Sequence, residues 1–211
     1  MSLKRLLIIY CIILFFLCPA FLYKPKVIAQ TAQEQAMTET GPEKQSFDPE
    51  LELKRFDELL EAGNISADIF YNRGWVFEYM GNLEKAEKEY TRAIEIDQGY
   101  VDAYYNRGLI YMSLKKYEHA VKDFSEAINL DPGSVDTLCN LGNAYLHLGK
   151  TEFALESYSK ALSIAPEDPD LYYNRAVIFL ALGEKNKAME DFKNAARLGH
   201  KTALEYMEKE D

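Results

Sequence analysis

Apolar residues follow two different patterns along the chain. Residues 6–23 form an apolar run that contains no charged side chain. From residue 49 onward, apolar residues instead return at intervals of three and four, which is the period of an amphipathic helix. Pairs such as Gly81-Asn82 and Gly149-Lys150 interrupt this second pattern where turns are expected. The sequence therefore predicts a hydrophobic N-terminal segment followed by many short helices.

The helical pattern predicts one helix over residues 49–64 and then four helix pairs. The first helices of the pairs are expected at residues 67–80, 101–114, 135–148 and 169–182. The second helices are expected at residues 83–96, 117–130, 151–164 and 185–197. A last helix at residues 201–209 would cover the end of the array, because a terminal repeat needs a cap with a polar outer side.

One short motif recurs at a fixed spacing. Tyr104-Tyr105-Asn106-Arg107-Gly108 has three close copies, so that asparagines lie 34 residues apart at Asn72, Asn106, Asn140 and Asn174. A period of about 20 to 50 residues is typical of a solenoid, in which stacked units bury their surfaces against one another. We therefore expect four units, at residues 67–100, 101–134, 135–168 and 169–200.

The repeated positions resemble the tetratricopeptide repeat (TPR) family, whose 34-residue units carry signature residues at eight places. In the second unit, places 4, 7, 8, 11, 20, 24, 27 and 32 hold Tyr104, Arg107, Gly108, Tyr111, Ala120, Phe124, Ala127 and Pro132. The resemblance implies an all-α, right-handed α-solenoid of four helix-turn-helix units. It has a preceding helix at residues 49–64 and a C-terminal capping helix at residues 201–211.

Two features of the repeats bear on packing. Small residues at place 8 predict close contact between the helices of a pair, against the alanines at place 20: Gly74, Gly108, Gly142 and Ala176 would face Ala86, Ala120, Ala154 and Ala188. At place 7, where an apolar residue is usual, three units hold Arg73, Arg107 and Arg175. We expect their aliphatic stems to pack and their guanidinium groups to reach solvent or a neighbouring carboxylate.

The N-terminal segment has two interpretations. Lys4 and Arg5 before an apolar stretch, with Cys18-Pro19-Ala20 or Val27-Ile28-Ala29 as the cleavage site, are typical of a signal peptide. Alternatively, residues 6–23 stay in place as a membrane anchor, since such a helix would span about 27 Å. Residues 1–29 are thus a signal or an anchor, and residues 30–48 a flexible tether. Both interpretations predict an exported protein in the cell envelope, either periplasmic, secreted or anchored to the inner membrane.

The charge of the chain argues against a nucleic acid partner. The formal net charge is −10, and residues 1–47 hold five of the 24 basic and three of the 34 acidic residues, which leaves 19 basic and 31 acidic residues beyond. An acidic surface repels a phosphate backbone. The partner is therefore expected to be a protein, with the membrane as a second contact if residues 6–23 remain uncleaved.

A concave groove lined by the first helices is the candidate site, because in such a stack the first helices face inward. Four in-register asparagines could pair with the main chain of an extended peptide, and the aromatic side chains would supply binding energy. The predicted groove residues are the amides Asn72, Asn106, Asn140, Asn143 and Asn174, the aromatics Tyr71, Trp75, Tyr79, Tyr105 and Tyr173, Met112, and the acids Asp68, Asp102, Asp136 and Asp170. The acidic margin favours a basic segment.

Each of these residues also has a purely structural explanation. The asparagines could serve helix packing, the tyrosines could belong to the core, and the aspartates lie in first turns, where they complement the helix dipole. A clamp for two carboxylates, as some TPR proteins carry, is not expected, because its basic places hold Asp136, Asn140 and Tyr71.

Catalysis and metal binding are not expected. Cys139, Asn143 and His147 share one helix face and have the residue types of a hydrolase site. However, Cys139 and His147 would lie about 12 Å apart along the helix axis, too far for thiol activation or for a shared metal ion. We therefore predict a non-enzymatic, cofactor-free module that binds an extended segment of a partner protein. The alternative is a structural module that pairs with copies of itself through its convex face or its last helix.

Overall fold

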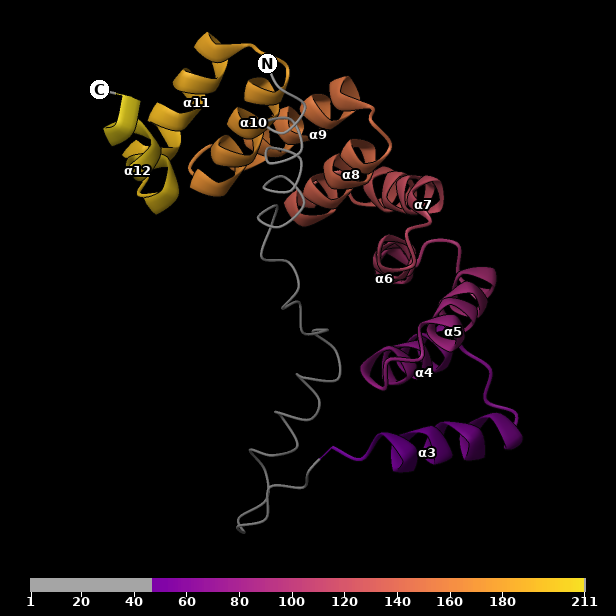
Figure 1. Cartoon of the computed structure of the whole chain (residues 1–211). Coiled ribbons are helices and arrows are strands. Elements are labelled where there is room, and N and C mark those ends of the chain that lie inside the picture. The colour runs from indigo at the N-terminus through magenta and orange to yellow at the C-terminus, as the bar shows by residue number, and fades with distance from the viewer. Residues whose placement is uncertain (1–46, 211) are drawn as a thin grey trace. The chain divides into compact units, whose positions relative to one another are not determined.

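A computed structural model describes residues 47–210, and this range contains ten helices and no strand (Figure 1). The first is α3, Pro49–Glu61, and the last is α12, Lys201–Glu210. Between them lie four helix pairs: α4 (Ala67–Tyr79) with α5 (Leu83–Ile96), α6 (Val101–Ser113) with α7 (Tyr117–Leu130), α8 (Val135–His147) with α9 (Thr151–Ile164), and α10 (Pro169–Ala181) with α11 (Lys185–Arg197). The predicted signal or anchor and most of the tether lie outside the described residues.

The paired helices end within one residue of the predicted positions, because caps and turns mark their ends. Ser66, Asn82 and Ser134 accept hydrogen bonds from backbone N–H groups of the first turns that they precede. The residue after each first-helix C-cap has positive φ. Glycine, which adopts such a φ easily, holds this position in the first, third and fourth units, and Lys115 holds it in the second, at φ 58°. No helix between residues 49 and 210 is long and apolar enough to cross a membrane.

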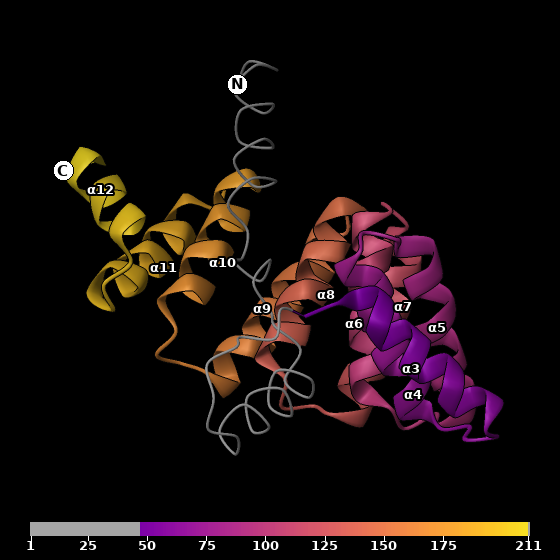
Figure 2. The ribbon, with the colours of Figure 1, turned by 90° about the horizontal axis from the view of Figure 1, so that it is seen from below.

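The described residues fall into two compact units, residues 47–130 and residues 131–210. In the first unit, α4 packs on α5 and α6 on α7, while α5 packs on α6 and α3 on α4 (Figure 2). In the second, α8 packs on α9 and α10 on α11, while α9 packs on α10 and α11 on α12. Within each unit, every helix thus contacts its neighbours in sequence, which is the packing of an α-solenoid.

The small residue at place 8 faces an aromatic ring. A methyl group at Gly108 would lie 2.6 Å from the Phe124 ring, and one at Gly142 would lie 2.9 Å from the Tyr158 ring. The nearest atoms belong to the ring at place 24, which the prediction did not name. The predicted alanine of place 20 is also a neighbour of Gly142, since the Ala154 carbonyl oxygen would lie 3.5 Å from the methyl group. The glycine makes room for a buried ring between the two helices of a pair.

The arginines at place 7 form ion pairs with carboxylates of the second helix. Arg107 donates from Nε and Nη2 to the two oxygens of Asp123, at 2.7 and 2.8 Å, and Arg175 meets Asp191 with the same distances. The expectation that a neighbouring carboxylate receives the guanidinium is confirmed for these two arginines. Arg73 makes a looser pair, with Nε 3.6 Å from Glu89 Oε2.

Each arginine also reaches the helix before its own pair. Arg107 Nη1 donates to Thr91 Oγ1 at 3.0 Å, and Arg175 Nη1 donates to Ser159 Oγ at 3.2 Å. Arg73 Nη2 lies 3.2 Å from Asp57 Oδ1 on α3. The helix α3 therefore contacts α4 in the way that α5 contacts α6, so it holds the place of a second helix.

Candidate partner-binding face

The first helices present a face on which places 2, 9, 12 and 13 are wholly or partly open to solvent in residues 47–130. On α4 this face carries Trp75, which is half-buried, and Tyr79, which is 61% exposed. On α6 the same places hold Leu109 and Met112, both half-buried, and the exposed Ser113. An open surface of this composition suits the apolar side chains of a partner.

An aromatic cluster covers the α4 part of this face. Trp75 and Tyr79 lie one helical turn apart, with ring centroids separated by 5.8 Å. Phe47, just before the N-cap of α3, packs edge-on against both, with its centroid 5.2 Å from that of Trp75 and 4.9 Å from that of Tyr79. The two predicted aromatic hot spots are thus brought together, and a third ring that sequence reasoning missed joins them.

The predicted asparagine row lies deeper than a ligand-contacting row would. Asn106, Asn140 and Asn174 are only 4%, 6% and 3% exposed. Asn106 Nδ2 donates to Tyr71 Oη at 3.0 Å, which ties α6 to α4. Asn72 is half-buried, and its buried Oδ1 accepts no hydrogen bond within the described part of the chain. The structural explanation accounts for Asn106, and contact of these amides with a ligand stays a prediction.

The other predicted amide and tyrosines are also engaged within the fold. Asn143 is buried and accepts a hydrogen bond from Tyr158 Oη at 2.6 Å. Tyr71 and Tyr105 are buried, and the Tyr105 ring packs 5.9 Å from that of Phe124. Tyr173 is half-buried and stacks on the His200 imidazole with a centroid distance of 4.1 Å.

The four aspartates of place 2 are exposed in the first turns of their helices: Asp68, Asp102, Asp136 and Asp170. Tyr100 Oη donates to Asp68 Oδ1 at 2.9 Å, and His200 Nε2 lies 3.5 Å from Asp170 Oδ1. These carboxylates give the face an acidic edge, and two of them also hold neighbouring segments.

Glu78 is an acidic residue of the α4 face that was not among the predicted site residues. It lies three residues after Trp75, so the two side chains share one side of the helix. Its Oε2 accepts a hydrogen bond from Tyr90 Oη at 2.7 Å. Burial raises the pKa of the Glu78 carboxyl above its usual value, and the Tyr90 hydrogen bond opposes this. Its place 12 position could have indicated it.

Cys139 and His147, the residues with catalytic character, both lie on α8. Cys139 is buried, His147 is half-buried, and burial lowers the pKa of the His147 imidazole. Within residues 47–210, no three or more His, Cys, Asp or Glu side chains are grouped so that they could hold a metal ion.

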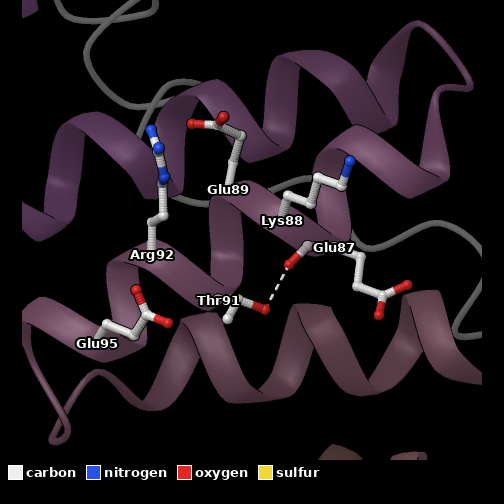
Figure 3. Close-up of a pocket in the computed structure, with 6 residues that line it drawn as sticks. All are labelled: Glu87, Lys88, Glu89, Thr91, Arg92 and Glu95. Carbon is white, nitrogen blue, oxygen red and sulfur yellow. Dashed lines mark hydrogen bonds between the residues drawn. The ribbon is translucent and has the colours of Figure 1, made fainter.

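The helix α5 carries an open depression on its surface. It is lined by Glu87, Lys88, Glu89, Thr91, Arg92 and Glu95, with Thr91 Oγ1 donating to the Glu87 carbonyl at 2.7 Å (Figure 3). These side chains fan out from one helix, and most are charged. Glu87 and Thr91 are already bonded to Lys116 and Arg107. The depression therefore lacks the apolar lining of a small-molecule pocket.

Protein-family models match the repeats directly. Models described as tetratricopeptide repeat match residues 101–134, 124–156 and 169–198, and one described as TPR repeat matches residues 76–115 and 142–183. Together they run from residue 76 to residue 198. The comparison with curated proteins gave no match.

Solved structures of MamA have a similar fold. One crystal structure of MamA is 20% identical, covers 87% of this chain and 99% of its own, and superposes with a TM-score of 0.70. MamA from residue 41 onward, from Desulfovibrio magneticus RS-1, is 18% identical, covers 82% and 93%, and has a TM-score of 0.66. Such low identity shows the fold alone. The repeat matches and the helix pairs together show that this chain belongs to the tetratricopeptide repeat family, a family of protein-interaction scaffolds.

Proposed function

We propose that this protein is a non-catalytic scaffold that binds an extended segment of a partner protein along the face of its first helices. The main support for this proposal is the open aromatic surface on α4, where Tyr79 is 61% exposed beside Trp75. Exposed tryptophan and tyrosine are the residues that contribute most binding energy in protein interfaces. The amides Asn106, Asn140 and Asn174 of the first helices are buried.

The chemistry of the face favours a partner segment with apolar and basic side chains. Leu109 and Met112 on α6 extend the apolar surface, while Asp68 and Asp102 form an acidic edge on the same two helices. Lysine or arginine side chains of the partner would lie against this edge. In residues 131–210, Leu146 and Leu180 at place 12 and Asp136 and Asp170 at place 2 repeat the arrangement.

The proposal includes a location in the cell envelope. It is supported by Lys4 and Arg5 followed by the apolar run of residues 6–23. Fusion of a reporter that folds only after export would test it, and a reporter active only in the cytoplasm would contradict it.

Photocrosslinking in cells tests the binding face. A photoreactive amino acid replaces Ser113 on the first helix α6 or, as the control, Ser163 on the second helix α9; both serines are exposed. We expect the Ser113 position to give an adduct that maps to one extended segment of one partner. A purified fragment of that partner should then bind wild type at least tenfold more tightly than the variant Ser113→Lys/Met112→Lys, which removes apolar surface and repels a basic segment.

Three outcomes are distinguished. Adducts at the Ser163 position alone would contradict binding along the first helices. Adducts that contain only a second copy of the chain would favour the self-assembly alternative. Unchanged affinity of the Ser113→Lys/Met112→Lys variant would show that the crosslinked contact does not contribute to binding.

A further inference from the structure

We propose that Trp75 and Tyr79 form a binding site for an aromatic side chain, and that the chain's own Phe47 occupies this site until a partner's aromatic residue replaces it. This inference rests on the proposed function and names its regulation. It is motivated by the position of Phe47, whose ring contacts both aromatic residues of the α4 face.

The contact has the form of a ligand complex. Both pairs have edge-to-face geometry, with centroids 5.2 and 4.9 Å apart, within the favourable range for aromatic pairs. Phe47 lies outside the helices, and Asp48 next to it has extended backbone, with φ −105° and ψ 104°. An extended segment that packs one ring against two others is what a partner peptide would present to this surface.

The contact is separate from the folding core of residues 47–130. The core cluster around Phe70, Phe77 and Tyr90 is joined by Leu53 and Leu60 of α3, and it does not include Phe47, Trp75 or Tyr79. Because α3 is held by these leucines and by the Asp57–Arg73 ion pair, it does not need Phe47 to stay in place. Phe47 can therefore leave the site without unfolding α3.

The site also favours a basic residue next to the aromatic residue of the partner. Glu78 lies on the same side of α4 as Trp75 and Tyr79, at a helical spacing of three from the first. Among residues 47–210, no lysine or arginine forms an ion pair with Glu78. A lysine or arginine beside the partner's aromatic residue would pair with this carboxylate, an interaction that Phe47 does not provide.

A tethered occupant weakens the binding of any competitor. The apparent dissociation constant rises by the inverse of the fraction of molecules whose site is empty. Because Phe47 is part of the same chain, its effective concentration at the site is about millimolar or higher. Removing Phe47 should therefore tighten binding of an aromatic ligand several-fold, whereas removing Trp75 should abolish it.

The fluorescence of Trp75 measures the occupancy, because this is the only tryptophan in the sequence. In the full-length chain, Phe47→Ala should shift its emission to longer wavelength and raise its quenching by acrylamide about twofold. Phe153→Ala, which removes an exposed ring that stacks on Tyr145, is the matched control and should change neither. Circular dichroism confirms that helix content is kept, and Phe47→Tyr should retain the wild-type emission.

Unchanged fluorescence in the folded Phe47→Ala variant would overturn the proposal, because Phe47 would then not cover Trp75. Wild-type emission that shifts on dilution would also overturn it, since Phe47 would then fill the site of a second copy. Neither result touches the crosslinking test at Ser113, so failure of this inference is distinguishable from failure of the proposed function.

A synthetic peptide of residues 42–50 tests whether the vacated site takes a ligand. Titrated into the full-length Phe47→Ala variant, it should restore the wild-type emission saturably, and a peptide with alanine in place of Phe47 should not. Wild type should bind the first peptide at least fivefold more weakly. If the peptide fails to bind although Phe47→Ala uncovers Trp75, the contact is structural and the proposed site is wrong.

Discussion

Arg107 and Arg175 lie at place 7, where an apolar side chain is usual in the repeat. Each forms an ion pair with a carboxylate of its second helix, Asp123 or Asp191. The third unit holds Leu141 and Ser157 at the two equivalent places, where Ser157 Oγ donates to the Phe153 carbonyl at 2.9 Å. The arginine–aspartate pair and the leucine–serine pair are therefore alternatives for the same two places of the repeat. An arginine here is therefore tolerated because its second helix supplies the acid.

Removing one partner of this pair should be costly. In Arg107→Ala the Asp123 carboxylate, 3% exposed, keeps its burial but loses both guanidinium hydrogen bonds. We expect a loss of about 3 kcal/mol in the free energy of unfolding, because an unpaired buried charge is strongly unfavourable. The double variant Arg107→Leu/Asp123→Ser copies the third unit and should recover most of this loss. Denaturant unfolding measures both, and equal losses in the two variants would contradict the account.

Substitution of Gly108 tests whether the Phe124 ring needs the space that a glycine leaves open. Gly108→Ala places a methyl group 2.6 Å from that ring, so the helices must separate or the ring must turn. Overpacking of this kind costs about 1 to 3 kcal/mol, which exceeds the gain of about 1 kcal/mol in helix propensity. We expect a lower melting temperature by circular dichroism. Ala176→Gly in the fourth unit, where alanine is already present, is the control and should cost about 1 kcal/mol.

Glu78 should make stability depend on pH in a direction unusual for a carboxylate. Its pKa is raised by burial in the folded protein above the ordinary value of 4.5, so the folded state holds the proton more tightly than the unfolded chain does. The associated stability is present below pH 4.5 and is lost as pH rises through the raised pKa. Glu78→Gln should therefore gain stability relative to wild type over this interval. Denaturant titrations at several pH values measure the difference in the free energy of unfolding between Glu78→Gln and wild type. A difference that does not change with pH would contradict this prediction.

At the scale of elements, the sequence predicts the helices well and their exposure less well. Apolar spacing and turn residues specify where α4 or α9 begins and ends, because these signals act locally. The burial of Asn106 depends on Tyr71, 35 residues earlier, and on how closely two helix pairs approach. Repeat position alone cannot distinguish an amide that faces a groove from one that lies just beneath it.

The helix α12 closes its unit through a small number of contacts. Ala203 is fully buried, and the Tyr206 ring lies 4.5 Å from that of Phe192 on α11. Tyr206→Ala should lower the free energy of unfolding by about 1 to 2 kcal/mol, through lost apolar burial and one lost aromatic contact. Leu204→Ala, at an exposed position of the same helix, should change it by less than about 0.5 kcal/mol. Hydrogen exchange of α11 amides would show the same order, and equal effects would contradict this role of Tyr206.

At the scale of the molecule, the family and the stacked helix pairs follow from the sequence period, whereas the aromatic cluster does not. Phe47 lies in a segment without periodicity, so nothing in the repeat pattern assigns it a contact. Its contacts with Trp75 and Tyr79 depend on how α3 packs against α4. The repeat pattern puts Glu78 at place 12 of the α4 face, but the hydrogen bond that it accepts from Tyr90 depends on how α5 packs against α4.

The contacts of α3 also bear on how such a chain can grow. Asp57 precedes Arg73 by the same 16 residues that separate Thr91 from Arg107 and Ser159 from Arg175. Within residues 47–210 the array therefore begins with half a repeat, and its natural duplication unit begins at a second helix. A longer array would therefore be built by inserting 34-residue segments that begin at a second helix. Their register can be checked by whether each new arginine at place 7 forms an ion pair with the carboxylate of its second helix.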